Sequence, residues 1–389
     1  MRVLYFWLVF GTYHVFLVGV SVLVARRLCE RLTPGLPWRR WLAACAGGAA
    51  LFGLASVAGA AAGVWLFPHR GFALVRFASQ ALFGEALLLA SWTAWKLWRV
   101  QARLFSALTA LVPLFLLAVY THAYHREPWA LRVSRHRLNL AQRAPADSSG
   151  VLRVVHLSDI QTHRVGDHER RAVRAALQLA PDVIVLTGDF VQERFEHPSP
   201  DGAATAAALR RLFREEGLGA PLGVYAVQGD TDRDWPGVLA GTDIVPLTDG
   251  AARVTLPDGT TLALVGLSNL TSRGRDREAV LRPVREAPSA DLTFVLGHRP
   301  EFVTALVADP LGARVSLALA GHTHGGQVAL PFIGPLVTAS TLPRRYAWGL
   351  NDFHGLPLHG SRGVGLERGV APPIRFGSPP EVCLIEVRY

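Results

Sequence analysis

Five short aliphatic runs in the C-terminal part of the chain each end in side chains that can bind a metal ion. The runs are VLRVVHL, DVIVL, GVYAV, LTFVL and VSLALA. The residues that follow them are Asp159 with Gln161, Asp189, Asp230, His298, and His322 with His324. Carboxylate oxygens and imidazoles together suit divalent ions such as manganese, iron or zinc. Two such ions about 4 Å apart, bridged by a shared carboxylate, bind a phosphoryl group and activate water for in-line attack.

Each of these residues alone has an ordinary explanation. An aspartate after a strand often caps a helix, and a single histidine is usually a core or surface residue. The segment GHTHGG, residues 321–326, is more specific. Alternate positions just beyond a strand direct His322 and His324 into one region, and the glycines allow close backbone approach. The complete ordered set therefore predicts a metal site.

Segments with helical spacing lie between the aliphatic runs, namely DHERRAVRAALQLA, DGAATAAALRRLFREE and RPEFVTALVAD. Strands that alternate with helices predict an α/β sheet whose functional groups gather beyond the carboxyl ends of its strands. A single sheet could then bring the donors together. The segment ARVTLPDGTTLALVGLS predicts a hairpin with an Asp258-Gly259 turn, so part of the sheet is antiparallel. The closing EVCLIEVRY predicts a further strand.

Four apolar segments near the N-terminus are long enough to cross a bilayer, which takes roughly 20 apolar residues. They are Val3–Ala25, Trp41–Phe67, Phe72–Trp95 and Leu104–Tyr124. A single such segment could be a buried core helix or, for the first, a signal peptide. The first segment lacks a small-residue cleavage site, and three similar segments follow it. We therefore predict four transmembrane helices within residues 1–125.

The formal net charge of +10 comes largely from arginines beside these segments. Such clusters favour phospholipid headgroups as partners over nucleic acid. The flanks of the first predicted helix carry one positive charge before it and five after it, which favours an extracytoplasmic C-terminal domain. The basic, polar stretch 126–150 predicts a juxtamembrane linker, and the folded domain is expected over 151–389.

Three cysteines, Cys29, Cys45 and Cys383, lie outside any C-x-x-C spacing. The sequence therefore predicts neither a disulfide framework nor a thiolate zinc site. We interpret these cysteines as small buried hydrophobic residues.

The stretches HLSDIQ, VLTGDF, AVQGDTD, LGHRPE and LAGHTHGGQV, with the tail 361–387, resemble the calcineurin-like metallophosphoesterases, especially their bacterial membrane-associated branch. The resemblance covers residues 151–389 and implies two mixed β-sheets flanked by helices, in a protein of the bacterial inner membrane. It also implies that Asp159 and His324 bind a first metal ion, that His298 and His322 bind a second, and that Asp189 bridges both.

Two positions depart from the family pattern. Gln161 replaces the family's first histidine, and Asp230-Thr231 replaces an Asn-His pair. Gln161 can still offer its amide oxygen, and Asp230 adds an anionic ligand. Because both changes supply oxygen donors, they favour hard ions, and we predict manganese dependence, with iron, zinc or magnesium as alternatives.

The substitution at Thr231 removes the histidine that, in the family, is thought to contact phosphate and protonate the leaving group. Threonine donates a hydrogen bond but is no acid near neutral pH. Either Asp232 or His163 supplies the proton, or the leaving group needs none, as when a phosphoanhydride expels phosphate with a second pKa of about 6. For His163 and for Arg362, which could meet substrate phosphate, a solvated loop residue is the alternative; His354 and His359 are weaker candidates.

These features predict a membrane-anchored, metal-dependent hydrolase of a phosphodiester or phosphoanhydride, acting on a phosphorylated small molecule or a lipid-linked or envelope substrate. The competing hypothesis is a catalytically impaired metal-binding domain that serves as a membrane sensor or scaffold, which Gln161 and Thr231 would favour.

Overall fold

The computed structural model describes residues 76, 79, 81–99, 103–141, 150–192, 202–233, 235–368 and 371–389. The chain divides into two compact units, Met1–His125 with Val370–Pro372, and Arg126–Gly369 with Pro373–Tyr389. Each unit is described by itself.

The described part of the first unit is helical. A π-helical turn, η2 (Ala81–Ala86), leads into α4 (Leu87–Arg99), and α5 (Arg103–Thr121) runs into a second π-helical turn, η3 (His122–Arg126). The Ser106 hydroxyl donates to the Ala94 carbonyl at 2.8 Å, which joins α5 to α4. Many large apolar side chains on α5 are exposed, including Leu111, Leu114 and Phe115.

One described helical stretch, Ser106–Trp129, is long and apolar enough to cross a membrane. It overlaps the predicted segment Leu104–Tyr124. The predicted segments Val3–Ala25 and Trp41–Phe67 lie outside the described residues, and Phe72–Trp95 lies within them only in part. The described residues therefore support one candidate span of the predicted four.

The first six-stranded sheet has the order β1-β14-β2-β3-β4-β5. Its strands are β1 (Arg132–Asn139), β14 (Glu381–Arg388), β2 (Val151–Leu157), β3 (Val183–Leu186), β4 (Val224–Ala226) and β5 (Ile244–Pro246). β14 runs antiparallel to β2, whereas β2 to β5 are parallel and β1 is parallel to β14. The C-terminal strand expected from EVCLIEVRY is thus confirmed.

β1 falls inside the stretch 126–150 that we expected to be a linker. Its side chains alternate between exposed and half-buried, and its register pairs Ser134 with Cys383 and His136 with Ile385. An edge strand with one solvated face carries many polar residues, which explains why its sequence resembles a linker.

The second six-stranded sheet has the order β12-β13-β9-β8-β7-β6. Its strands are β12 (Gly349–Phe353), β13 (Leu356–Gly360), β9 (Leu317–Ala320), β8 (Leu292–Gly297), β7 (Thr261–Gly266) and β6 (Gly250–Thr255). β6 and β7 form the predicted antiparallel hairpin, and Gly259 in its turn has φ 89°. Two short strands, β10 (Ala329–Leu330) and β11 (Gly334–Pro335), form a separate two-stranded sheet.

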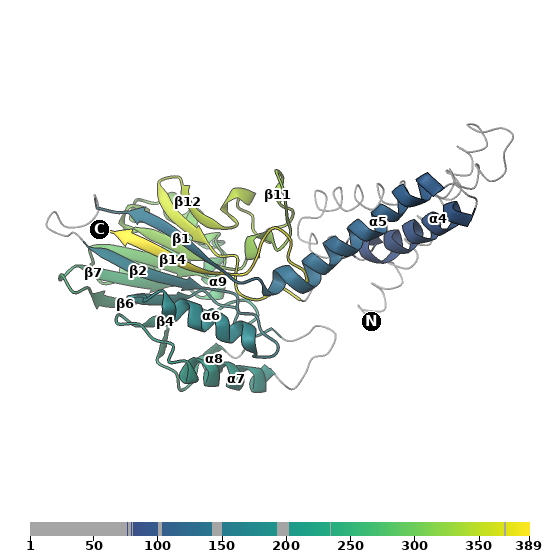
Figure 1. Cartoon of the computed structure of the whole chain (residues 1–389). Coiled ribbons are helices and arrows are strands. Elements are labelled where there is room, and N and C mark those ends of the chain that lie inside the picture. The colour runs from purple at the N-terminus through teal and green to yellow at the C-terminus, as the bar shows by residue number, and fades with distance from the viewer. Residues whose placement is uncertain are drawn as a thin grey trace. The chain divides into compact units, whose positions relative to one another are not determined.

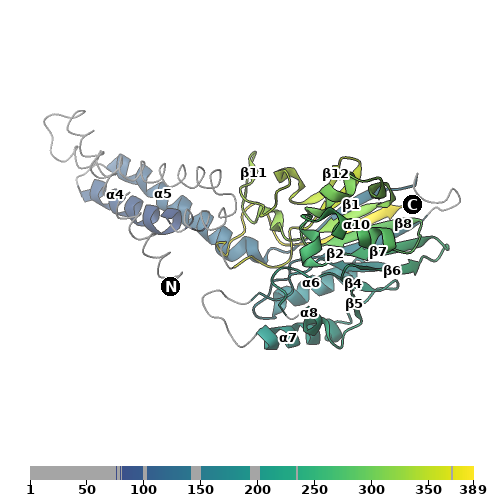
Figure 2. The ribbon, with the colours of Figure 1, turned by 180° about the vertical axis from the view of Figure 1, so that it is seen from behind.

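Helices cover the outer faces of both sheets (Figures 1 and 2). The helices between strands of the first sheet are α6 (Asp167–Gln178), α7 (Gly202–Glu215) and α8 (Trp235–Leu239). Those between strands of the second sheet are α9 (Asn269–Ser272), α10 (Arg277–Glu286) and α11 (Phe302–Val307). Short 3₁₀ turns complete the domain: η4 (Glu127–Trp129), η5 (Pro310–Arg314), η6 (His324–Gly326) and η7 (Arg344–Tyr346).

Three apolar clusters hold these layers together. One packs Val155 and Ile184 of the first sheet against α6 and α7. The second lies between the two sheets and joins Val154 to Phe294, and the third packs Val295 against α10 and α11. Because neighbours such as Val154 and Val155 point to opposite faces of a strand, both faces of each sheet are buried. The mixed α/β sandwich of two sheets flanked by helices is therefore confirmed.

The strands that carry the candidate ligands belong to both sheets. β2, β3 and β4 of the first sheet end beside β8 and β9 of the second, so the site lies where two sets of parallel strands end together. A single sheet does not collect these residues, because β8 and β9, which lead to His298, His322 and His324, belong to the second sheet.

Candidate metal centre

The loops after five strands bring all seven predicted ligands into one cluster. Across the two sheets, Asp159 Oδ1 lies 3.5 Å from His324 Nε2, and Asp189 Oδ2 lies 3.4 Å from His298 Nε2. Asp230 Oδ1 lies 3.7 Å from His298 Nε2, and Asp230 Oδ2 lies 3.4 Å from His322 Nδ1. The remaining member, Gln161, donates from Nε2 to Asp189 Oδ2 at 2.9 Å.

Two overlapping sets of donors can hold an ion. Asp159, Asp189 and His298 form one, and Asp230, His298 and His322 form the other, with the donor atoms of each set within 4.8 Å of one another. The sets share His298 and join the carboxylates of the first sheet to the imidazoles of the second. The residue types are those that bind divalent metal ions.

Hydrogen bonds orient two of the imidazoles for metal binding. His298 Nδ1 lies 2.8 Å from the Thr187 carbonyl, which can only accept, so Nδ1 carries the proton and the buried Nε2 keeps its lone pair. His322 Nε2 likewise meets the Ala339 carbonyl at 3.2 Å, leaving Nδ1 to face Asp230. Second hydrogen bonds of this kind set the tautomer of metal-ligating histidines.

The ligand loops are held in a strained backbone conformation. Positive φ values occur at five of the candidate ligands, namely Asp159, Gln161, Asp189, His322 and His324, with φ between 36° and 68°. Residues other than glycine seldom adopt this region, and such outliers concentrate at functional sites. Close packing accompanies them: a Cβ at Gly229 would lie 2.1 Å from Asp189 Oδ1, so only glycine fits there.

The electrostatics of the cluster fit a cation. Burial, reinforced by the nearby Asp189 carboxylate, raises the pKa of Asp159 to about 7. Burial alone would lower the pKa of His298, but the surrounding carboxylates of Asp189, Asp230 and Asp159 hold it well above its usual value. The raised pKa values of Asp159 and His298 mean that bound protons offset the negative charge of the clustered carboxylates. A divalent ion, when bound, would neutralise the same charge.

Gln161 has one polar atom without a protein partner. Its Nε2 meets two carboxylates, Asp189 Oδ2 at 2.9 Å and Glu367 Oε2 at 3.3 Å, so the NH₂ group must face them. Its buried Oε1 has no hydrogen-bond partner among the described residues. A buried amide oxygen left in this way is a suitable metal ligand, because an unpaired polar group is otherwise costly.

The three predicted catalytic residues occupy different surroundings. Asp232 is buried, and its carboxylate accepts from the backbone N–H groups of Asp189, Phe190 and Gly229 at 2.7 to 2.9 Å. Thr231 donates its backbone N–H to Asp189 Oδ1 at 2.9 Å, and its buried Oγ1 has no hydrogen-bond partner among the described residues. His163 is half-buried, and neither donor set includes it.

Arg362 is engaged within the protein. Its backbone N–H donates to Glu381 Oε1 at 2.8 Å, its guanidinium lies 3.7 Å from Glu381 Oε2, and it stacks 5.3 Å from the ring centre of Trp348.

The structure adds residues that the sequence motifs did not suggest. Arg299 forms an ion pair with Asp230, and Arg375 Nη2 lies 3.2 Å from His324 Nδ1. Glu367 binds both Gln161 and Gln192, at 3.3 and 2.8 Å. Arg299 directly follows His298 and was visible in the LGHRPE motif, whereas the other two lie in the C-terminal tail. The sequence gives no sign that Glu367 and Arg375 reach the site, because the folding of the tail brings them there.

The sequence is similar to those of known proteins. Residues 152–326 match the family described as calcineurin-like phosphoesterase. A Bacillus subtilis protein named uncharacterized metallophosphoesterase YkuE is 25% identical over 277 residues, covering 69% of this chain and 90% of that protein. UDP-2,3-diacylglucosamine pyrophosphatase LpxG of Chlamydia trachomatis is 27% identical over 331 residues, covering 69% and 92%. A Danio rerio transmembrane protein with metallophosphoesterase domain is 28% identical over 246 residues, covering 56% and 52%.

The fold and the donor cluster define a metal-dependent phosphoester hydrolase. The chain contains a calcineurin-like metallophosphoesterase domain, as its sequence motifs predict.

Proposed function

We propose that this protein is a membrane-anchored, two-metal hydrolase of phosphoanhydride bonds, acting on a lipid-linked or nucleotide-linked pyrophosphate. The observation that carries this choice is that, among the described residues, Thr231 and Asp232 offer no uncommitted acid beside the donor cluster. Thr231 is at the position where the family has a histidine. The carboxylate of the neighbouring Asp232 accepts hydrogen bonds from three backbone N–H groups. A leaving group that is itself a phosphate needs little protonation, because its second pKa is about 6.

The side chains of the cluster have separable roles in this proposal. Divalent ions, when bound, polarise the phosphoryl group and activate water. Asp159, Gln161 and His324 would hold one ion, Asp230, His298 and His322 the other, and Asp189 would contact both. Thr231 Oγ1, buried and without a hydrogen-bond partner among the described residues, would donate a hydrogen bond to a phosphoryl oxygen. The guanidinium of Arg299 neutralises Asp230 and offers further donors to phosphate.

The donor set supports manganese as the working metal. Four carboxylate or amide side chains, Asp159, Gln161, Asp189 and Asp230, supply oxygen, and hard oxygen donors suit manganese better than zinc. Iron, zinc and magnesium are the alternatives.

The membrane placement supports a lipid-linked substrate. The relative named UDP-2,3-diacylglucosamine pyrophosphatase acts, by its name, on a nucleotide-linked acylated sugar, and another relative is named a transmembrane protein. In our proposal this chain is a multi-pass protein of a bacterial inner membrane, its catalytic domain extracytoplasmic, with the apolar stretch Ser106–Trp129 as one span. A diacylated substrate would then reach the site from the bilayer surface.

A Thr231→His substitution tests the leaving-group argument. The variant supplies the missing acid, and we expect it to raise hydrolysis of an alkyl phosphodiester roughly 10-fold or more, while a UDP-linked diacylated sugar gains little. Both rates are measured on the full-length protein in detergent with manganese. If the unmodified protein cleaves the alkyl diester faster than the pyrophosphate, the phosphoanhydride proposal is wrong.

Asp189→Ala is the control for this experiment and separates the enzyme from a scaffold. We expect it to abolish hydrolysis of both substrates, because it removes the ligand that, in our proposal, contacts both metal ions. Equal rates with and without Asp189 would instead support the non-catalytic sensor or scaffold, which Gln161 and Thr231 otherwise favour.

A further inference from the structure

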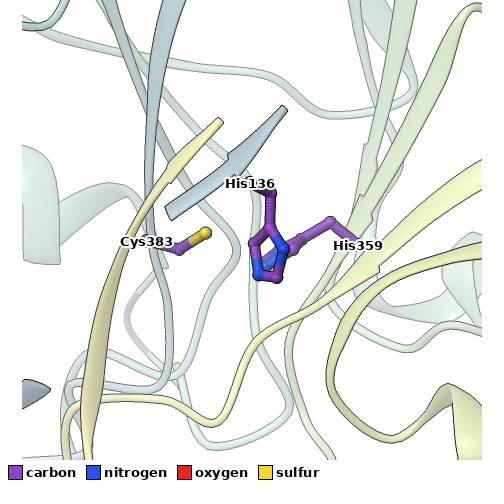
Figure 3. A group of neighbouring side chains, drawn as sticks. All are labelled: His136, His359 and Cys383. Carbon is purple, nitrogen blue, oxygen red and sulfur yellow. The ribbon is translucent and has the colours of Figure 1, made fainter. Parts of the chain in front are cut away.

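A second group of metal-binding side chains lies in the interior of the domain, on strands that carry none of the ligands described above. His136 belongs to β1, Cys383 to β14 and His359 to β13. One donor atom from each lies within 4.8 Å of the others. Figure 3 shows the Cys383 sulfur on the side of its strand that faces the two imidazoles. Cys383 and His359 are completely buried, and His136 is half-buried.

Histidines are unusual in this position, because the surrounding space between the sheets is filled with aliphatic and aromatic side chains. Cys383 lies in the same apolar cluster as Ile385 and Val387. Burial lowers the pKa of His136 and His359 below the ordinary value, so both imidazoles are neutral. A neutral imidazole is the form that binds a metal ion.

Hydrogen bonds determine which nitrogen of His359 is available. Ser158 Oγ donates to Asp159 Oδ2 at 2.5 Å, so Ser158 must accept from Thr187 Oγ1, 2.6 Å away. Thr187 in turn accepts from His156 Nε2 at 2.8 Å, which leaves His156 Nδ1 as an acceptor. His359 Nδ1, 2.8 Å from His156 Nδ1, must therefore be the donor.

The consequence is a lone pair on His359 Nε2. This nitrogen is buried and has no hydrogen-bond partner among the described residues. An unpaired buried acceptor is costly unless another group satisfies it. A metal ion bound by His136 and Cys383 would do so.

We propose that His136, His359 and Cys383 form a second metal site, separate from the phosphoesterase centre, for a zinc or copper ion. One thiolate and two imidazoles are a soft donor set, unlike the oxygen-rich set at the phosphoesterase centre. A tetrahedral zinc site places its nitrogen and sulfur donors about 3.3 to 3.6 Å apart. Small side-chain rotations would bring the three donors to that separation.

Binding requires one covalent change. The Cys383 thiol loses its proton to solvent, and the sulfur bonds to the ion. Burial raises the pKa of this thiol well above its usual value, so a metal ion must displace the proton.

The site would also be connected to the phosphoesterase centre. Hydrogen bonds run without interruption from His359 through His156, Thr187 and Ser158 to Asp159. The Ser158 hydroxyl, which donates to Asp159 Oδ2, sets the direction of the hydroxyl donors in this chain. That direction presents the free lone pair of His359 to the second site.

Cobalt(II) is the probe that separates the two sites. Cobalt bound to a thiolate gives an intense sulfur-to-metal charge-transfer band in the near ultraviolet, and the oxygen and nitrogen donors of the phosphoesterase centre cannot. We expect this band when the reduced, metal-free, full-length protein is titrated with cobalt, at about one thiolate-bound ion per chain. Zinc added afterwards should abolish it.

Matched variants assign the band. Cys383→Ser should remove it, whereas Cys29→Ser with Cys45→Ser should leave it unchanged, because those cysteines lie outside the proposed site. His136→Gln, at a half-buried position of the edge strand, should weaken cobalt binding roughly 10-fold or more. Aryl phosphodiester hydrolysis by each variant with manganese checks that it is folded.

Two results would overturn the second site. One is the absence of a charge-transfer band at saturating cobalt, and the other is a band that survives Cys383→Ser in a folded, active variant. Neither result bears on the phosphoanhydride proposal, which depends on Thr231 and Asp232.

Discussion

Gln161 shows how a single side chain adjusts the chemistry of the metal centre. Its amide nitrogen is held by the carboxylates of Asp189 and Glu367, and its amide oxygen is left buried beside the cluster. A histidine here would offer a softer nitrogen donor. As a metal ligand, Gln161 would keep this position filled while changing the donor atom.

Gln161→His should shift the metal preference from manganese toward zinc, since imidazole replaces an oxygen donor. We expect the ratio of zinc-supported to manganese-supported activity to rise roughly 10-fold. The measurement is aryl phosphodiester hydrolysis by metal-free protein reconstituted with each ion. Gln192→His is the matched control: Gln192 also binds Glu367, but its amide oxygen is satisfied by the Arg368 N–H, so the ratio should not move. An equal shift in both variants would argue against Gln161 as a ligand.

At the scale of the elements, the tail between β13 and β14 is fastened by one buried arginine. Arg375 is fully buried and donates to the Arg362 carbonyl and the Ser378 carbonyl at 2.8 Å each, and to the Gly365 carbonyl. The same guanidinium lies against His324. Burial lowers its pKa to about 9, so it remains charged at neutral pH. The tail and the candidate ligand His324 thus share one support.

Arg375→Met should destabilise the domain by about 3 kcal/mol or more, because several buried carbonyl groups lose their donors together. Chemical unfolding measures this effect. Arg282→Met, at an exposed position of α10, should change the free energy of unfolding by less than about 0.5 kcal/mol. Arg375→Met as stable as Arg282→Met would show that the tail is held by its apolar contacts instead.

At the scale of the whole domain, the metal centre concentrates acidic groups at the meeting point of two sheets. Burial, reinforced by the Asp189 carboxylate, raises the pKa of both Asp159 and Asp232 to about 7. Their folded pKa values exceed those of the unfolded chain, so protonation stabilises the metal-free fold. This contribution is complete below about pH 4 and is lost as the pH rises through 7. The raised pKa of His298 acts in the same direction.

The stabilisation by manganese should therefore grow with pH. Between pH 5.5 and 8 we expect the melting temperature of the metal-free protein to fall, while added manganese restores it by a margin that widens toward pH 8, because the ion binds ionised carboxylates. Thermal unfolding at matched ionic strength measures both curves. A metal-free melting temperature that rises across this range would contradict the pKa shifts of Asp159 and Asp232.

Local sequence patterns were enough to predict the alternation of strands and helices, the hairpin at Asp258-Gly259 and the types of donor that follow the strands. These features depend on local periodicity and turn chemistry, which short stretches of sequence carry. The same reasoning did not predict the polar edge strand β1, because a strand with one solvated face contains few apolar residues.

The surroundings of residues whose partners are distant in sequence became visible only in the folded domain. Asp232 is adjacent to Thr231 in the motif, yet its carboxylate accepts from backbone groups on two loops. The sequence alone led us to interpret Cys383 as a small buried hydrophobic residue. Strand register and sheet packing show that it lies beside His136 and His359. Hydrogen-bond partners and donor geometry depend on which strands pair and how the two sheets pack, and no local pattern in the sequence encodes that arrangement.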